Sequence, residues 1–138
     1  MAVRYFDASA LVKLVLPEIE SRATRELWRA ARCVSSALAT VEVMRAARRA
    51  PRPEDAVERA REVLSGLVRL PLTDEILQTA GMLRPAGLRS LDAIHLASAL
   101  TLGEELDGMV VYDRTLAEAA RGYGIRILAP HQTPDGDG

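Results

Sequence analysis

Short apolar runs typical of strands alternate along this chain with longer segments typical of helices, and this alternation constrains the fold more than any other feature. Strands are predicted at residues 2–6, 33–35, 109–112 and 125–128, with a further extended piece at 68–72. Helices are predicted between them, at about 8–15, 18–32, 37–49, 54–67, 74–84, 90–102 and 115–122. Strands separated by helices indicate a parallel sheet that is covered on both faces. We therefore predict one three-layer α/β domain over residues 1–129, with four to five parallel strands flanked by helices, and a disordered tail at 130–138.

The composition agrees with one domain and excludes several classes of site. A chain of 138 residues with 49% hydrophobic residues suffices for a single core. Cys33 is the only cysteine, so no internal disulfide forms, which suits a reducing compartment. No stretch reaches the roughly 18 apolar residues of a membrane span, and the N-terminus lacks a signal-peptide layout, so we expect a cytoplasmic protein. The sequence contains no Gly-rich phosphate loop, and its two histidines and one cysteine cannot form a zinc site of the usual kind.

The net charge of -1 hides an uneven distribution of charge along the chain. Residues 22–61 contain ten Arg and five acidic residues, whereas residues 84–138 contain five Arg and eight acidic residues. The first half therefore carries the basic surface. Lys13 is the only lysine, and the planar guanidinium of arginine suits phosphate binding. A GC-rich genome produces the same bias towards arginine and is the simpler explanation.

Two aspartates directly follow predicted strands. Asp7 ends the first strand and Asp113 ends the run MVVY. The ordinary interpretation of each is an N-cap for the helix that follows. Ser9 is an alternative cap beside Asp7. Residues 115–118, Thr-Leu-Ala-Glu, fit a capping box, which would leave Asp113 free for another role.

Two further acids lie within predicted helices. Glu42 is beyond the first turn of a helix that Ser36 can cap, and Arg45 and Arg49 share its face, so a surface ion pair is its ordinary interpretation. Asp92 lies in the first turn of a helix that Ser90 can cap. That helix is apolar nearly all round, which marks a buried element, and a buried carboxylate needs more than a helix dipole to compensate it. His95, one turn later, could hydrogen-bond Asp92.

A doubly wound sheet would bring these acids together. Ligands bind such sheets outside the carboxyl ends of the strands, where the strand order reverses. With the order 3-2-1-4-5, Asp7 and Asp113 follow neighbouring strands about 4.8 Å apart. Two carboxylates about 4 Å apart repel by about 4 kcal/mol at an effective dielectric constant of 20. Oxygen ligands without His or Cys select Mg2+ or Mn2+, and such ions support phosphoryl chemistry by activating a bound water.

Other polar residues would serve the same site. Ser9, on the first turn after Asp7, could orient a water molecule or a phosphate. Arg45, Arg49 and Lys13 could hold a polyanionic substrate, and Arg114 is a weaker candidate for that role.

Four segments together resemble a known family: DASALVKL, VEVMRA, SLDAIHLASAL and VVYDRTLAEAARGYGI. In this order and at these separations they resemble PIN-domain ribonucleases, specifically VapC-type toxins of toxin-antitoxin modules, over about residues 3–128. The chain departs from the family pattern at Val111, because such proteins often carry Thr or Ser two positions before the last Asp.

The resemblance implies a function, a site and partners. It implies a catalytic and metal-binding quartet of Asp7, Glu42, Asp92 and Asp113, with Ser9 as hydroxyl partner. It also implies an Mg2+- or Mn2+-dependent endoribonuclease that forms a homodimer and is inhibited by a small VapB-like antitoxin.

Three other functions are alternatives to this interpretation. A haloacid-dehalogenase-type phosphatase needs a second Asp where this chain has Ser9. A receiver domain needs paired acids early in the chain and its phosphorylated Asp after a middle strand. The alternative that stays open is a catalytically weak PIN-like module that binds RNA or protein, although a pure RNA binder gains nothing from negative charge in its groove.

Overall fold

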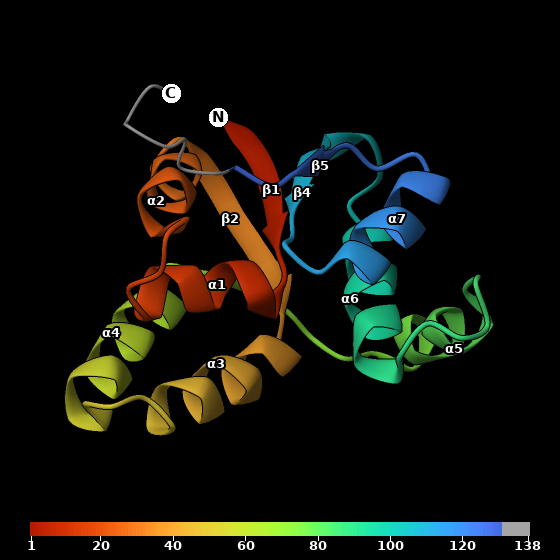
Figure 1. The fold of residues 1–138 in the computed structure, drawn as a ribbon. Helices are drawn as coiled ribbons and strands as arrows, with labels where there is room; N and C mark the ends of the chain where they lie inside the picture. The colour runs from red at the N-terminus through yellow and green to blue at the C-terminus, as the bar shows by residue number, and fades with distance from the viewer. Residues whose placement is uncertain (131–138) are drawn as a thin grey trace.

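A five-stranded parallel sheet forms the centre of the protein in the computed structural model, which describes residues 1–130 (Figure 1). The strands are β1 (Ala2–Phe6), β2 (Ala31–Ser36), β3 (Val68–Leu70), β4 (Leu106–Val110) and β5 (Ile127–Leu128). Their order is β3-β2-β1-β4-β5, and every neighbouring pair is parallel. The predicted order 3-2-1-4-5 is therefore confirmed, and β1 and β4 are the adjacent strands at which the direction of winding reverses.

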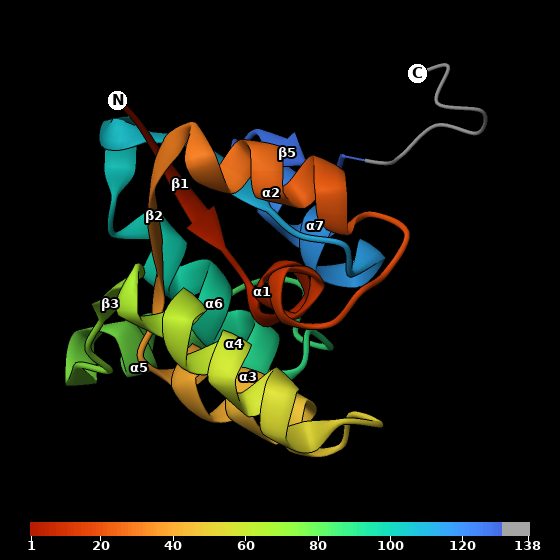
Figure 2. The ribbon, with the colours of Figure 1, turned by 90° about the vertical axis from the view of Figure 1, so that its left-hand side faces the viewer.

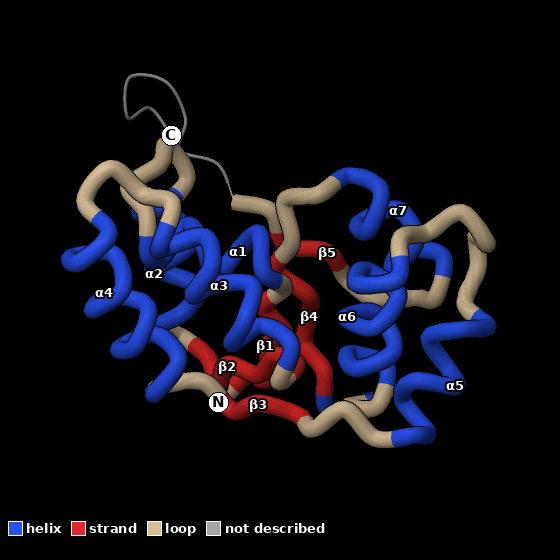
Figure 3. The backbone as a smooth tube through the Cα atoms, turned by 90° about the horizontal axis from the view of Figure 1, so that it is seen from below, coloured by secondary structure: helices blue, strands red, loops and turns tan. Residues whose placement is uncertain are grey.

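Helices cover both faces of this sheet. The first group is α1 (Ala8–Val15), α2 (Ser21–Arg29), α3 (Leu38–Arg48) and α4 (Pro53–Ser65). The second is α5 (Asp74–Met82), α6 (Ser90–Leu100) and α7 (Arg114–Gly122), with a short 3-10 turn at Gly103–Glu105. Figure 1 and the view from below in Figure 3 place these two groups on opposite sides of the strands.

Alternating side chains of the central strands divide the core into two halves. Successive strand residues point to opposite faces of a sheet. Tyr5 accordingly packs in the cluster beneath α5, α6 and α7, whereas Phe6 packs beneath α1 to α4, with its ring against Trp28. On β4, Met109 and Val110 divide in the same way. Both faces of β1 and β4 are therefore buried, as their nearly continuous apolar runs require.

Two predicted elements have clearly different boundaries in the structure. The helix predicted at 18–32 ends at Arg29, because β2 already begins at Ala31, where it pairs with Ala2 of β1. The strand predicted at 109–112 spans Leu106–Val110 instead. It begins earlier because Leu106 pairs with Val3, and the Arg4 guanidinium then forms an ion pair with Asp107 at 3.1 Å.

The longest of the described helices, α4, has 13 residues, and no helix within residues 1–130 is long and apolar enough to cross a bilayer. The disorder predicted for the tail concerns residues 131–138, which lie outside the described residues.

Candidate active site

Asp7 is buried and lies between β1 and α1, two elements that follow one another in Figure 2. It follows β1 in an extended conformation, and its Oδ1 caps α1 by accepting a hydrogen bond from the Ala10 amide at 3.1 Å. Ser9 Oγ donates to the same Oδ1 at 2.6 Å, and within residues 1–130 no hydrogen bond reaches Oδ2. Asp7 was thus correctly considered as a cap, and Ser9 does not replace it.

Burial makes this carboxyl group unusually basic. Asp7 is 4% exposed, and its burial raises the pKa to about 6. Hydrogen bonds from Ser9 and Ala10 and the nearby His95 act in the opposite direction, while the Asp92 carboxylate raises the pKa further. A cation beside Asp7 would remove this unfavourable energy, because it stabilises the charged form.

Asp113 occupies the matching position after β4. It caps α7 by accepting a hydrogen bond from the Leu116 amide at 2.9 Å. The prediction that Thr115 would cap this helix was wrong, because α7 already begins at Arg114 and Thr115 is inside it. A cap on Oδ1 leaves the second carboxylate oxygen of Asp113 for other interactions.

Ser9 connects the ends of the two central strands. Its Oγ accepts a hydrogen bond from the Tyr112 amide at 3.0 Å while donating to Asp7. The hydroxyl group therefore fixes the carboxylate after β1 relative to the segment after β4. Val111, at which the sequence departs from the pattern that the resemblance implies, is fully buried, and its amide donates to Leu128 O at 3.1 Å.

Asp92 lies in the first turn of α6 and is half-buried. Ser90 is the first residue of that helix, so the prediction that it caps the helix was wrong; Arg89 precedes the helix without a side-chain cap. Burial, followed by the carboxylates of Asp113 and Glu42, raises the pKa of Asp92, partly opposed by His95 and Arg89. Asp92 therefore experiences the charges of two other members of the predicted quartet. The buried character predicted for α6 is confirmed.

Glu42 does not form the surface ion pair that its neighbours on the helix suggested. The Oε1 atom of Glu42 on α3 lies 2.6 Å from Nε2 of His95 on α6. Glu42 makes no ion pair with Arg45 or Arg49. The Nδ1 atom of His95 lies 2.7 Å from the Tyr5 hydroxyl. His95 therefore contacts Glu42 rather than Asp92. The predicted cap of α3 was also wrong: Ala37 occupies that position, and Ser36 Oγ accepts from the Leu38 amide.

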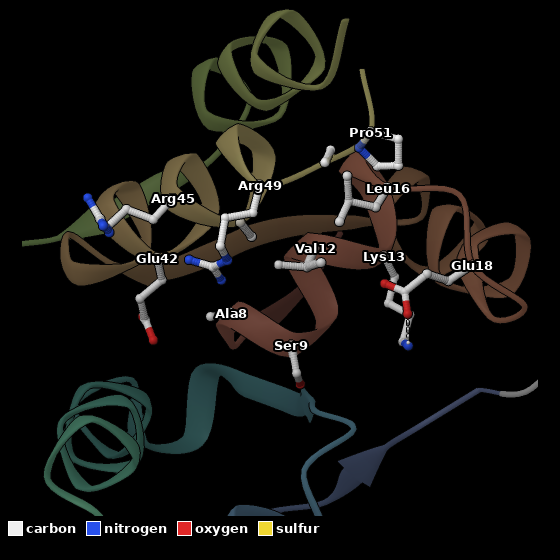
Figure 4. A pocket seen from close by; sticks show the side chains of 12 residues that line it. Ala8, Ser9, Val12, Lys13, Leu16, Glu18, Glu42, Arg45, Arg49 and Pro51 are labelled. Atoms are coloured by element: carbon white, nitrogen blue, oxygen red, sulfur yellow. Dashed lines mark hydrogen bonds and ion pairs between the residues drawn. The ribbon is translucent and has the colours of Figure 1, made fainter. Parts of the chain in front are cut away.

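A cleft of about 750 Å3 opens beside Glu42, between α1 and α3 (Figure 4). Ser9, Lys13, Arg45 and Arg49 contribute to its walls, whereas Asp7, Asp92 and Asp113 do not. In Figure 4 the Arg49 guanidinium lies between the two helices, and the Arg45 side chain points away from α1. The exposed side chains of Arg45 and Arg49 form no ion pair within the described residues.

The other two predicted cations have different surroundings. Lys13 forms ion pairs with Glu18 and Glu20, both at 2.9 Å, and lies over the Tyr112 ring. Its charge is thus already balanced. Arg114 is exposed at the start of α7 and lines a separate cavity of about 370 Å3.

The fold brings the predicted acids to one edge of the sheet, where Asp92 interacts electrostatically with Asp7, Glu42 and Asp113. Among residues 1–130, however, no three His, Cys, Asp or Glu side chains are arranged so that they could hold a metal ion as they stand. The quartet is therefore a set of neighbouring carboxylates, and metal binding would need side-chain rearrangement.

Comparison with known proteins agrees with this geometry. The family model described as PIN domain matches residues 4–126. The chain belongs to the PIN-domain family. Ribonuclease VapC46 of Mycobacterium tuberculosis (strain ATCC 25618 / H37Rv) is 44% identical to this PIN-domain protein over 131 residues, which are 94% of this chain and 99% of the relative. Ribonuclease VapC47 of M. tuberculosis (strain CDC 1551 / Oshkosh) is 41% identical over 132 residues, covering 91% and 96%.

The match fits the topology of the PIN domain described above. It begins in β1 and ends just before β5, so it includes Asp7, Glu42, Asp92 and Asp113. The hydrogen bond from His95 to Asp92 that the sequence suggested is not formed, because His95 contacts Glu42 and Tyr5 instead. A single polar ring in an otherwise apolar helix was the available signal, but it does not identify the partner.

Proposed function

We propose that this PIN-domain protein is a VapC-type toxin, an endoribonuclease that hydrolyses RNA phosphodiester bonds and depends on Mg2+ or Mn2+. The observation that carries the proposal is the proximity of four acids at the edge where the central strands end: the Asp92 carboxylate raises the pKa of Asp7, and the Asp113 and Glu42 carboxylates raise the pKa of Asp92. Relatives named Ribonuclease VapC that align over nearly the whole chain support it. In a module that only binds RNA, such a concentration of negative charge would lower the affinity for the RNA phosphates.

The donor groups at this edge fit a hard divalent cation. All four acids offer carboxylate oxygens, which Mg2+ and Mn2+ prefer over the nitrogen and sulfur ligands of softer ions. Asp7 has an oxygen without a hydrogen bond, and its burial disfavours the bare anion. We propose that Asp7, Asp92, Asp113 and Glu42 hold the ion. When bound, it would neutralise phosphate charge and acidify a water nucleophile.

The chain's own residues would organise the site before any ion arrives. Ser9 holds Asp7 by a hydrogen bond and joins it to the end of β4. Asp113 is held at its position by capping α7. We propose that the scissile phosphate lies beside these groups and that the adjoining RNA follows the cleft between α1 and α3.

Cleavage of total cellular RNA tests the proposed function directly. The parent protein in Mg2+ should cleave RNA, whereas EDTA should abolish cleavage. Asp92→Asn should reduce the rate by about 100-fold or more. Loss of a residue that orients a metal ligand costs up to about 100-fold, and loss of a ligand itself should cost at least as much. The measurement is RNA fragment length against time, and circular dichroism shows that the variant is folded. Equal activity of parent, EDTA-treated parent and variant would reject the nuclease and favour the binding module.

Arg45 and Arg49 give a prediction about substrate binding. Replacing both with Ala should raise the KM for a single-stranded RNA oligonucleotide by about tenfold and leave kcat within about twofold. The salt dependence of binding should also become shallower, by about 0.7 in log-log slope for each phosphate that the variant no longer neutralises. KM and binding constants at several salt concentrations provide the measurement.

Arg32→Ala is the matched control for these arginines. Arg32 is also exposed, but it lies near the start of β2, at the opposite edge of the sheet. Its removal changes the net charge without touching the cleft. If Arg32→Ala changes the KM or the salt slope by as much per removed charge as the double cleft variant does, the arginines act through general charge and not as a substrate site. Lys13, with both acidic partners, should matter less than Arg49.

The partners in this proposal are an RNA substrate, a second copy of the chain and a VapB-like antitoxin, in the cytoplasm. Light scattering of the purified protein tests the homodimer. Co-purification with the product of an adjoining small gene, followed by loss of RNA cleavage in the complex, tests the antitoxin. A monomer, or a complex that remains fully active, would contradict these parts of the proposal.

A further inference from the structure

His95 joins the two helices that carry Glu42 and Asp92. Its ring is 1% exposed, and both ring nitrogens have partners, Glu42 at 2.6 Å and Tyr5 at 2.7 Å. Its ring also meets the Tyr5 ring edge to face, with centroids 5.8 Å apart. A buried ring fixed on three sides is a rigid support for whatever it contacts.

The hydrogen-bond roles of His95 follow from its partners. An ionised carboxylate only accepts hydrogen bonds, so Nε2 must donate to Glu42. A tyrosine hydroxyl has an ordinary pKa of about 10 and keeps its proton near neutral pH, so the Tyr5 hydroxyl can donate to Nδ1. Tyr5 thus favours the tautomer in which the hydrogen is on Nε2, where Glu42 needs it.

Without this contact Glu42 would have a different neighbour. Arg45 lies three residues further along α3, and residues at this spacing are neighbours on a helix surface. Arg45 could therefore form an ion pair with the flexible Glu42 side chain. His95 lies three residues after Asp92 and shares its face of α6. The hydrogen bond from His95 therefore directs the Glu42 side chain from α3 towards α6, the helix that carries Asp92.

We infer that His95 is a positioning residue, which keeps the Glu42 carboxylate near Asp92 at the edge where the central strands end, the place at which divalent-metal binding and RNA cleavage need it. The inference rests on the proposed function. His95 itself contacts no substrate in this scheme and acts only through Glu42. Partners that orient metal-binding carboxylates in this way commonly affect metal affinity or activity by about 10- to 100-fold.

Two substitutions separate the hydrogen bond from the packing of the ring. His95→Phe keeps a ring of similar size but cannot donate to Glu42. His95→Gln presents an amide N–H near the position of Nε2. Thr101→Ala is the control, since Thr101 follows the last residue of α6 and its hydroxyl donates to Ser98 O in the same helix.

The readouts are Mn2+ affinity without RNA, by electron paramagnetic resonance, and kcat and KM on a fluorogenic random-sequence oligoribonucleotide. His95→Phe should weaken Mn2+ binding and lower kcat by about tenfold or more, with KM changed less than about twofold. His95→Gln should recover most of both decreases, and Thr101→Ala should match the parent. In a Glu42→Gln background, His95→Phe should cause no further decrease.

Several outcomes would overturn the inference. A folded His95→Phe protein with parental Mn2+ affinity would do so, as would a full additional decrease in the Glu42→Gln background. If His95→Phe does not fold, His95→Asn replaces it, because its shorter amide cannot reach Glu42; equal behaviour of the Asn and Gln variants then overturns the inference. A parent that neither binds Mn2+ nor cleaves RNA would overturn the proposed function as well, whereas an active parent with unaffected variants overturns only the role of His95.

Discussion

Asp7→Asn should abolish RNA cleavage and at the same time make the metal-free protein more stable at pH 7. The Asn side chain keeps an oxygen that can accept the hydrogen bonds from Ala10 and Ser9, so the cap of α1 survives. It removes the negative charge, however, and with it a principal ligand of the proposed metal. We expect cleavage to fall by about 1000-fold, as for removal of a central electrostatic group.

The stability effect follows from the pKa of Asp7. Burial raises it from 3.8 to about 6, so between these pH values the folded protein binds a proton that the unfolded chain has released. The free energy of unfolding therefore decreases as pH rises from about 4 to about 6 and stays reduced above that range. The difference between the two pKa values corresponds to about 3 kcal/mol at most. Asp7→Asn removes this cost, so its advantage should grow with pH and reach a plateau near neutrality.

Denaturant unfolding in EDTA between pH 4 and pH 8 measures this effect, and thermal melts with and without Mg2+ measure metal binding. The parent should melt at a higher temperature in Mg2+, and Asp7→Asn should not respond. Glu62→Gln, which removes an exposed charge on α4, should behave as the parent in every measurement. An Asp7→Asn protein with the parental pH profile and the parental Mg2+ response would contradict both the buried charge and the metal site.

The topology was predictable from the sequence because it depends on local patterns. Apolar runs of strand length, separated by helical segments, admit few arrangements, and the right-handed crossover rule reduces them further. Asp7 and Asp113 could be placed together for the same reason, since each directly follows a strand. Even the three-residue β3 was anticipated as an extended piece at 68–72.

Caps and cross-sheet contacts were harder to predict because several residues compete for them. Thr115 fits a capping box, yet Asp113 is nearer to the point where the backbone leaves β4 and takes the position. The contact between His95 and Glu42 joins residues 53 positions apart. This contact depends on how α3 and α6 are placed relative to each other at the sheet edge. The apolar pattern of each helix shows which of its faces is buried, but it does not show this relative placement. The neighbouring arginines instead suggested a local ion pair.

Ser9→Ala should both destabilise the protein and impair catalysis, because one hydroxyl group serves two partners. Its loss removes the acceptor of the Tyr112 amide, and an unsatisfied buried donor costs about 1 to 3 kcal/mol. It also removes the hydrogen bond that lowers the pKa of Asp7. The Asp7 pKa should therefore rise further, and the pH range over which metal-free stability declines should extend upwards. We expect RNA cleavage to decrease by about 10- to 100-fold.

Ser9→Thr separates the hydroxyl group from the rest of the side chain. It keeps the donor to Asp7 and the acceptor for Tyr112, so stability and cleavage should stay close to those of the parent. Urea unfolding at pH 5 and pH 8, with RNA cleavage at saturating Mg2+, compares the three proteins. If Ser9→Ala is as stable and active as Ser9→Thr, the link between the ends of β1 and β4 is not needed to hold Asp7. The Asp7 carboxylate would then be positioned by its cap on α1 alone. The acids proposed for RNA cleavage would have to be held in place mainly by α6, through the contact between His95 and Glu42.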